Sequence, residues 1–465
     1  MKNTTEFEAL EAAMEKKKRI QDLEVAVPMI NKKNRINHQE QEEVDRITQL
    51  PDHIIHHILS LMPLKSAVRT SILSNTWKDL WKPMWVNTTI LDFGADFAGD
   101  KPFYLLSHII NRLLQLLQTG NNKTIDIFRL YFDPQVQFLP NIQHWIEFAV
   151  QNGVKELDLD FTLETFELFF DVVQSRYELP PCLVSCDSMA VLRLGGYSFE
   201  LPRGFRGFGS LRALHLTRVR IAHHVLDEML LKCPMLEEFS LVDCCGSCSF
   251  LFSAADLKIK SFTLMDCHGA KKVGVFVSRL AHLQILRTCL LPDFYVLELE
   301  IAPVNFPITL PNLIELQLGV CDQYPGGLIA FFRYWNFPCL EKLMLEWIPP
   351  FCTWMDWTEE SSGCVFHRLK TITLNGFYGS AWQMMVVKFL LKKAVILETM
   401  VLVTPKEGID AYQSDESLSQ AKPNVALLHE QLLPLPKVST NARIVLHEHS
   451  EDDNSLFCTH DRFIL

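Results

Sequence analysis

A six-residue pattern of apolar positions, L-x-x-L-x-L, recurs along most of the chain. Units begin at residues 189, 211, 236 and 259, which are 22, 25 and 23 residues apart, and at 313, 340, 369 and 397, which are 27, 29 and 28 apart. The alternation inside each unit is typical of a strand, whereas runs between units, such as Val225–Leu231, have helical spacing. Strand followed by helix, repeated, predicts a curved solenoid with a parallel sheet on its inner face.

Two gaps interrupt this regularity. The first unit, Val154–Phe161, begins 35 residues before residue 189, so we expect an irregular loop between them. The gap of 54 residues between 259 and 313 would hold one degenerate repeat, around Leu283–Leu286 or Val296–Leu299. The spacing elsewhere is that of leucine-rich repeats, whose period is about 20–29 residues.

Side chains alternate along a strand, so the apolar residues of each unit face the core and the residues between them face out. The outward set mixes charge and polarity without a stripe of one sign. These residues either contact a protein target or form a solvated sheet face. The candidate contacts are Asp158, Asp160, Arg193, His215, Gln317 and Glu346.

A compact helical module is predicted over residues 47–85. Pro51 and Asp52 suit the start of a helix that Pro63 ends, and its apolar face is formed by Ile54, Ile55, Ile58 and Leu59. A second short helix follows. Ser74 is predicted to cap a third, which carries Trp77, Leu80, Trp81 and Trp85. Three short helices cannot bury all these side chains, and exposed apolar surface of this kind usually marks a partner site.

The order and spacing of residues in this module closely resemble the F-box, particularly its plant form. The resemblance implies binding of the Skp-type adaptor of a cullin-based ubiquitin ligase. It assigns the adaptor interface to Leu50, Pro51, Ile54, Ile55, Ile58, Leu59, Pro63, Val68, Leu73, Trp77, Leu80 and Trp81. Two departures occur: Met62 stands where leucine is usual, and Asn75-Thr76 replaces the commoner basic residues.

A second resemblance covers the last repeats. Leu369–Gly379, Phe389–Ala394 and Leu397–Glu398 are similar to the FBD domain of plant F-box proteins, although the acidic position of its helix is absent here, where the chain reads Gln383-Met384-Met385. Ala442–Leu446 is expected to be the closing strand. Altogether, residues 47–404 resemble plant F-box/leucine-rich-repeat/FBD proteins, which implies an α/β fold with a three-helix F-box, a curved solenoid and an FBD-like end. The expected segments are a disordered charged leader (1–46), F-box (47–85), solenoid (86–368), FBD-like region (369–446) and a disordered acidic tail (447–465).

The amino-acid composition limits the classes of partner and the cellular compartments that we expect for this protein. The 44 basic and 55 acidic residues give a net charge of −11, which argues against a nucleic-acid binder held by phosphate contacts. Thirteen cysteines, an odd number, without a secretory leader favour reduced thiols. With no apolar run of membrane length, we expect a protein of the nucleus, the cytoplasm or both. The clusters Lys16–Arg19 and Lys32–Arg35 are either nuclear import signals or part of a solvated leader.

No motif indicates catalysis or a cofactor. Cys244, Cys245 and Cys248, with Cys267 and His268 one repeat later, are interpreted as packing residues rather than a metal site. The glycine-rich run Gly204–Gly209 lacks phosphate-binding spacing and is expected to be a loop. His53, His56 and His57 share a helix face that we interpret as solvated.

The resemblance therefore implies a non-catalytic substrate-recognition subunit of an SCF-type ubiquitin ligase. Its expected partners are the Skp-type adaptor, through it a cullin, and an unidentified protein target. Two alternatives remain open at this point: an adaptor-binding scaffold without degradative function, and a small-ligand co-receptor of the same architecture. An enzyme is the least favoured reading.

Overall fold

A computed structural model of the chain describes residues 50–62, 64–73, 77, 80–118, 124–162, 176–178, 180–196, 198–201, 204–219, 223–244, 257–267, 273–289, 308–321, 326–348, 365–405 and 425–447. The chain forms two compact units, Met1–Trp81 and Lys82–Leu465. The predicted leader, the tail from residue 448 and Pro63 lie outside the described residues, as do Cys245, Cys248 and His268. Each unit is described separately below.

The first unit contains the start of the helical module. Helix α2 (Asp52–Ser60) begins directly after Pro51, whose carbonyl accepts the backbone N–H of Ile54 at 2.9 Å. Helix α3 (Leu64–Arg69) continues into the 3₁₀ turn η2 (Thr70–Ile72). The first two helices of the module are thus present as predicted.

The predicted third helix is wrong. Trp77, Leu80 and Trp81 lie in turns, Ser74 lies outside the described residues, and helix α4 (Lys82–Val86) begins only in the second unit. Pro83 explains the difference. Proline lacks an N–H and its ring clashes with the carbonyl four residues earlier, so it is tolerated only in the first turn of a helix. A helix through Pro83 from Ser74 is excluded, and a new one starts at Lys82.

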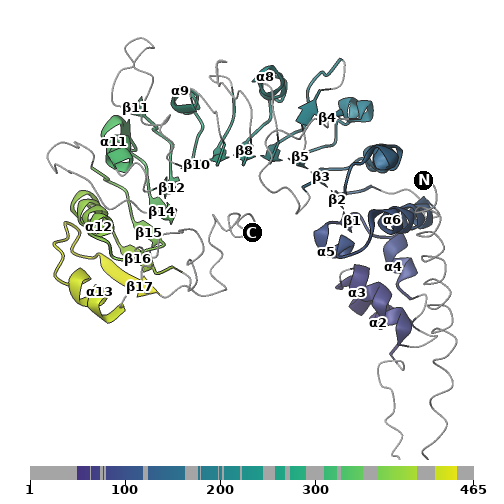
Figure 1. Cartoon of the computed structure of the whole chain (residues 1–465), viewed down its shortest axis with the longest axis horizontal. Helices are drawn as coiled ribbons and strands as arrows, with labels where there is room; N and C mark the ends of the chain where they lie inside the picture. The colour runs from purple at the N-terminus through teal and green to yellow at the C-terminus, as the bar shows by residue number, and fades with distance from the viewer. Residues whose placement is uncertain are drawn as a thin grey trace, which may run out of the picture. The chain divides into compact units, whose positions relative to one another are not determined.

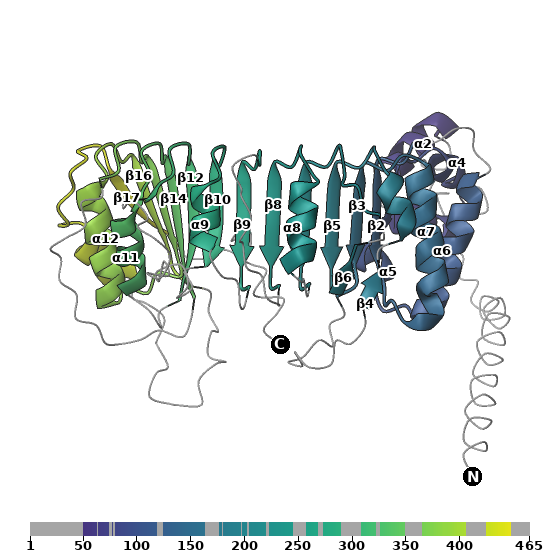
Figure 2. The same cartoon turned by 90° about the horizontal axis from the view of Figure 1, so that it is seen from above.

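A parallel sheet of 13 strands dominates the second unit, in the order β1-β2-β3-β5-β7-β8-β9-β10-β12-β14-β15-β16-β17 (Figure 2). The strands are β1 (Ile90–Phe93), β2 (Ile127–Tyr131), β3 (Glu156–Asp160), β5 (Val191–Gly195), β7 (Ala213–Thr217), β8 (Glu238–Val242), β9 (Ser261–Met265), β10 (Ile285–Cys289), β12 (Glu315–Cys321), β14 (Lys342–Ile348), β15 (Thr371–Asn375), β16 (Thr399–Val403) and β17 (Arg443–His447). Two short parallel pairs lie outside it, β4 (Arg176–Glu178) with β6 (Ser198–Glu200) and β11 (Ile308–Thr309) with β13 (Trp335–Asn336).

The repeat prediction is confirmed and extended. Every predicted unit is a strand, the degenerate repeat is β10, and the expected closing strand is β17. Strands β1 and β2 were not predicted. The FBD-like strands β15 to β17 continue the same sheet as the repeats, since β14 pairs with β15 in register from Lys342↔Thr371 onward.

Helices cover one face of this sheet. Within the second unit, strands line the inner side of the curve and most of the helices lie on its outer side (Figure 1). The helices are α5 (Ala95–Ala98), α6 (Phe103–Gln118), α7 (Leu139–Gln151), α8 (His223–Leu231), α9 (Val273–Ser278), α11 (Gly326–Tyr334), α12 (Ala381–Lys393) and α13 (Val425–Leu432), with 3₁₀ turns η3 (Val136–Phe138) and η4 (Pro181–Ser185). The α/β solenoid with its parallel sheet on the concave face is therefore confirmed.

The pairing register of the strands stacks equivalent apolar residues of neighbouring repeats and so forms the core of the second unit. Leu192 of β5 lies beside Leu214 of β7, and both are fully buried, as are the alternate apolar residues of the other repeats. The phenylalanines continue this packing: the ring of Phe262 lies 5.6 Å from that of Phe239 and 5.4 Å from that of Phe276 on α9. Burying each such side chain contributes about 2 kcal/mol, so every repeat depends on its neighbours.

Most of the cysteines whose burial the structure describes are buried, in line with the prediction, whereas Cys182 and Cys339 are half-buried. The Cys244 thiol, just after β8, donates a hydrogen bond to the carbonyl of Leu216 in the preceding repeat at 3.4 Å. The fully buried cysteines of the described residues are Cys186, Cys233, Cys244, Cys267 and Cys289. The run Gly204–Gly209 is a loop, as expected, with Phe205 and Phe208 buried.

Candidate docking surfaces

The apolar side of α2 divides into two parts. Ile55 and Leu59 are buried, whereas Ile54 and Ile58, one helical turn apart, remain 38% and 39% exposed. Leu61, which ends the helix, is 75% exposed. Three large apolar side chains at positions i, i+4 and i+7 therefore form an exposed row along one face of the helix.

The segment after α2 adds to this surface. Ala67 is buried on α3, but Val68, Ile72 and Leu73 are exposed, Ile72 at 86%. Apolar side chains at this exposure usually mark an interaction site. We call the following residues the F-box apolar face: Ile54, Ile58, Leu61, Val68, Ile72 and Leu73.

The predicted interface residues thus fall into different places. Ile55, Leu59 and Trp77 are buried and cannot touch a partner without a change in the unit. Leu50, Leu80 and Trp81 are half-buried, Pro51 is exposed, and Pro63 lies outside the described residues. Leu61 and Ile72, which are strongly exposed, were not among the predicted interface residues. Their positions at the ends of helices give no periodic signal, because periodicity identifies a helix face only where several turns share it.

The concave face of the sheet is the second surface. Asp158 on β3, Arg193 on β5 and His215 on β7 lie side by side in register, and Asp160 lies one pleat further along β3. Glu346, on β14, lies apart from this group and is half-buried. The structure therefore brings four of the six predicted target contacts together.

The prediction that Gln317 is an exposed contact residue is wrong. It is only 1% exposed, although it stands on the concave face of β12. Its amide oxygen accepts a hydrogen bond from Arg287 Nε at 3.1 Å, and its amide nitrogen donates to Glu315 Oε1 at 2.5 Å. Arg287 on the adjacent strand β10 and Glu315 on β12 itself hold its side-chain amide, so Gln317 is not exposed to a target.

Charges on the concave face form a ladder around Glu156. Its Oε1 accepts hydrogen bonds from Arg193 at 2.7 Å and Arg129 at 3.2 Å, and Arg129 also pairs with Asp92 at 3.0 Å. Both arginines are therefore engaged away from Asp158. Burial raises the pKa of the Asp158 carboxyl to about 6, with Arg193 opposing the rise and Asp160 adding to it. Burial also lowers the pKa of His215.

The described residues also bear on two other kinds of function, metal binding and membrane insertion. In them, no group of three or more histidine, cysteine or acidic residues is placed to hold a metal ion. Of the helices in the described part of the chain, none is both long enough and apolar enough to cross a membrane.

Three family models match the chain. The F-box domain model matches residues 47–88, the model of the LRR repeats of FBD-associated F-box protein At5g56370 matches residues 142–304, and the FBD model matches residues 361–402. The resemblance seen in the sequence is therefore confirmed: the chain carries an F-box, leucine-rich repeats and an FBD.

Proteins of Arabidopsis thaliana are among the relatives of this chain. F-box/FBD/LRR-repeat protein At1g13570 is 24% identical over 449 residues, which cover 87% of this chain and 99% of that protein. F-box/FBD/LRR-repeat protein At1g78750 is 30% identical over 208 residues, covering 43% and 42%. FBD-associated F-box protein At4g10400 is 34% identical over 198 residues, covering 42% and 44%. The chain thus has the domain composition of the plant F-box/FBD/LRR-repeat proteins.

Proposed function

We propose that this protein is the substrate-recognition subunit of an SCF-type ubiquitin ligase, acting in the nucleus or cytoplasm. The F-box apolar face docks the Skp-type adaptor, which links the chain to a cullin, and the solenoid binds a target protein. The observation that carries the proposal is the exposure of Ile54, Ile58, Leu61 and Ile72 on helices that match the F-box.

The mechanism is proximity rather than catalysis by this chain. A target held on the solenoid is kept near a ubiquitin-conjugating enzyme carried by the cullin, so the effective concentration of the target lysine rises. The charged ladder and the neighbouring Asp158 provide a polar surface for such a target. The bond-forming chemistry belongs to other subunits, and the chain contributes binding energy and orientation.

The test is co-purification with a Skp-type adaptor using the double variant Ile54→Asp/Ile58→Asp. Each side chain is expected to contribute about 1.5 kcal/mol of burial to docking, so the pair should lower adaptor affinity more than 100-fold. Because both residues are exposed in the free chain, the helices should keep their circular dichroism. Val136→Asp/Leu427→Asp, on exposed apolar residues of the second unit, is the matched control.

Retained adaptor binding in Ile54→Asp/Ile58→Asp, or an equal loss in the control variant, would contradict the docking surface. A second readout separates ligase from scaffold. With adaptor, cullin and conjugating enzyme present, the wild-type chain should support ubiquitin transfer to a bound protein. Adaptor binding without any cullin recruitment would favour a scaffold instead.

A further inference from the structure

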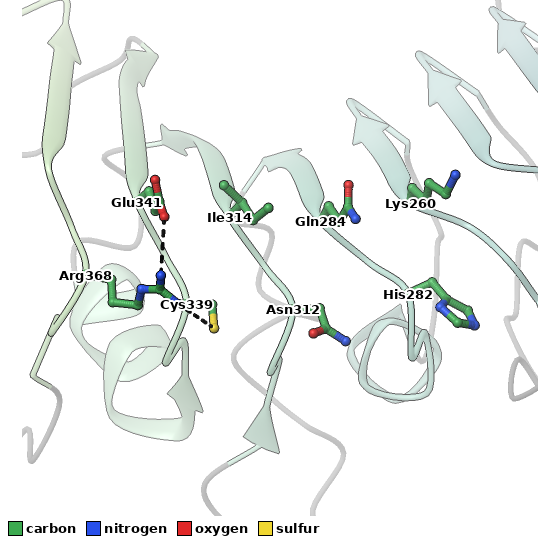
Figure 3. Close-up of a pocket in the computed structure, with 8 residues that line it drawn as sticks. All are labelled: Lys260, His282, Gln284, Asn312, Ile314, Cys339, Glu341 and Arg368. Atoms are coloured by element: carbon green, nitrogen blue, oxygen red, sulfur yellow. Dashed lines mark hydrogen bonds and ion pairs between the residues drawn. The ribbon is translucent and has the colours of Figure 1, made fainter.

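The edge of the large sheet where the strands begin carries a groove of about 450 Å³. It crosses the starts of β9, β10, β12, β14 and β15, all within the second unit. Its lining residues are Lys260, His282, Gln284, Asn312, Ile314, Cys339, Glu341 and Arg368. Figure 3 shows Arg368 and Lys260 at opposite ends, with Asn312, Ile314 and Gln284 between them.

Register places these side chains in rows. Gln284, Ile314 and Glu341 each stand just before the first residue of their strand, and Ile285, Glu315 and Lys342, which follow them, are paired Cα partners. Neighbouring strands lie about 4.8 Å apart, so the four steps from β9 to β15 span about 19 Å. That is the length of about six residues of extended chain. The groove therefore fits a short extended segment running across the strands.

Basic side chains outnumber acidic ones along this edge. Glu237 is paired with Lys260 at 3.0 Å and Arg212 at 3.1 Å, and Glu341 with Lys370 at 3.0 Å. These contacts lower the pKa of both carboxyl groups, so both are ionised and neutralised. A further lysine stabilises the ionised form of each carboxyl group electrostatically: Lys258 for Glu237 and Lys342 for Glu341.

Both end groups retain donors for a ligand. The Lys260 ammonium has three N–H groups and spends one hydrogen bond on Glu237. Arg368 has five N–H groups, but its nearest acceptors are distant: Glu341 Oε1 at 3.9 Å and the Cys339 sulfur at 3.7 Å. Each end of the groove can therefore accept a carboxylate without breaking a strong existing contact.

The middle of the groove suits a peptide backbone. The Asn312 amide nitrogen donates to the carbonyl of Ala281 at 2.8 Å, which leaves its oxygen as an acceptor. Gln284 is exposed, and a carboxamide can both donate to and accept from a peptide group. Between them the exposed side chain of Ile314 offers an apolar contact. The chain's net charge of −11 repels a polyanion such as nucleic acid more strongly than a short peptide with two acidic residues, whose two carboxylates match the two basic ends of the groove.

We propose that this groove binds an extended acidic segment of another protein, with one carboxylate at Lys260, one at Arg368, and the backbone along Gln284 and Asn312. This surface goes beyond the proposed function, which uses the F-box apolar face and the concave face of the sheet. It lies wholly in the second unit, so it does not depend on adaptor docking.

The test is fluorescence anisotropy of the full chain with a labelled hexapeptide, Asp-Gly-Leu-Gly-Gly-Asp, against the same peptide with Asn at both ends. The acidic peptide should bind at least tenfold more tightly than the amide peptide, and the difference should shrink as salt is raised. Lys260→Gln/Arg368→Gln should lower the affinity for the acidic peptide at least tenfold and remove the preference. Gln284→Ala should weaken both peptides alike, by a few-fold.

The control is Lys155→Gln/Lys388→Gln, which changes the net charge equally at exposed residues outside the groove. An equal loss in this control, or unchanged binding in Lys260→Gln/Arg368→Gln, would overturn the proposal. Equal competition by free succinate at the same carboxylate concentration would also overturn it, because it would indicate a simple anion site. Adaptor binding should be unaffected by the groove variants, so failure here is distinct from failure of the F-box assignment.

Discussion

Asp158 shows how one side chain on the concave face differs from its neighbours. Its two flanking arginines, Arg129 and Arg193, are hydrogen-bonded to Glu156 instead, and in the described part of the chain no hydrogen bond to the Asp158 carboxylate is found. A carboxylate held partly out of water without a direct partner is costly to ionise. The ionised Asp158 carboxylate is therefore destabilising for the fold at neutral pH, and it has room to accept a cation or a hydrogen-bond donor.

This cost predicts a pH dependence. Because burial raises the pKa of Asp158 in the folded chain to about 6, above its value of 3.8 in the unfolded chain, the folded state binds the proton more tightly. The free energy of unfolding that this group contributes is highest below pH 4 and falls as pH rises to about 6. Asp158→Asn should therefore stabilise the second unit by about 1 kcal/mol at pH 7.5, after allowance for its partial exposure, and by little at pH 4.5.

Urea unfolding at the two pH values measures this difference. Asp126→Asn is the control with the opposite sign, because a hydrogen bond from Lys155 lowers the pKa of Asp126. That variant should lose stability at pH 7.5 rather than gain it. A stabilisation by Asp158→Asn that is the same at both pH values would show that the carboxylate charge is not its cause.

At the scale of elements, Gln383 accounts for a departure from the FBD pattern. It lies in the first turn of α12, in the stretch Gln383–Met385 where the acidic residue of the FBD pattern is absent, and it is buried. Its amide oxygen accepts the backbone N–H groups of Tyr378 and Gly379 at 2.8 and 3.0 Å, much as a carboxylate would. Its amide nitrogen also donates to the carbonyl of Gly376 at 3.0 Å, which a carboxylate cannot do. Glutamine thus satisfies donors and an acceptor of the same turn.

Gln383→Ala should destabilise the second unit by about 2 kcal/mol, because two partly buried backbone N–H groups and one partly buried carbonyl lose their partners. Thermal unfolding followed by circular dichroism measures the loss. Gln143→Ala, which removes an exposed hydrogen bond to Glu147 on α7, should change stability by less than about 0.5 kcal/mol. Comparable losses in the two variants would refute the role of Gln383 in the turn.

The elements also show what a sequence can and cannot predict here. The repeat strands could be predicted from the alternating leucines, because every strand of a parallel solenoid sheet needs the same spacing of buried side chains. Strands β1 and β2 were missed because their aromatic and β-branched residues, such as Ile127 and Phe128, do not follow the leucine pattern. The third helix was predicted wrongly because the spacing of the tryptophans outweighed Pro83.

The sequence predicted the apolar face of α2 but did not tell which of its residues are exposed. Ile54, Ile55, Ile58 and Leu59 form one wide apolar stripe, and periodicity alone does not tell which edge is buried. That depends on packing within the unit. The groove at the start of the strands could not be predicted either, because Lys260 and Arg368 are more than 100 residues apart and stand at turn positions without a periodic pattern.

At the scale of the whole second unit, the sheet has the connectivity of a one-dimensional array. Each of its strands pairs only with its immediate neighbours in the order β1 to β17, so the energy of each repeat is shared with two others. Such an array is expected to open locally at a weakened repeat rather than unfold as a single unit. One strand already departs from the pattern: Thr288 on β10 is fully buried where other repeats carry leucine.

This organisation predicts where a core defect will act. Phe262→Ala removes the ring that contacts Phe239 and Phe276, and it should cost about 3–5 kcal/mol. Amide hydrogen exchange followed by mass spectrometry should then show lost protection in β8, β9 and β10, with β2, β3 and β16 nearly unchanged. Phe128→Ala, a buried residue of β2 that contacts Phe93, should instead lower protection in β1 to β3. If both variants lowered protection uniformly across the sheet, the second unit would unfold as one cooperative body, and the description of it as an array of separately opening repeats would be wrong.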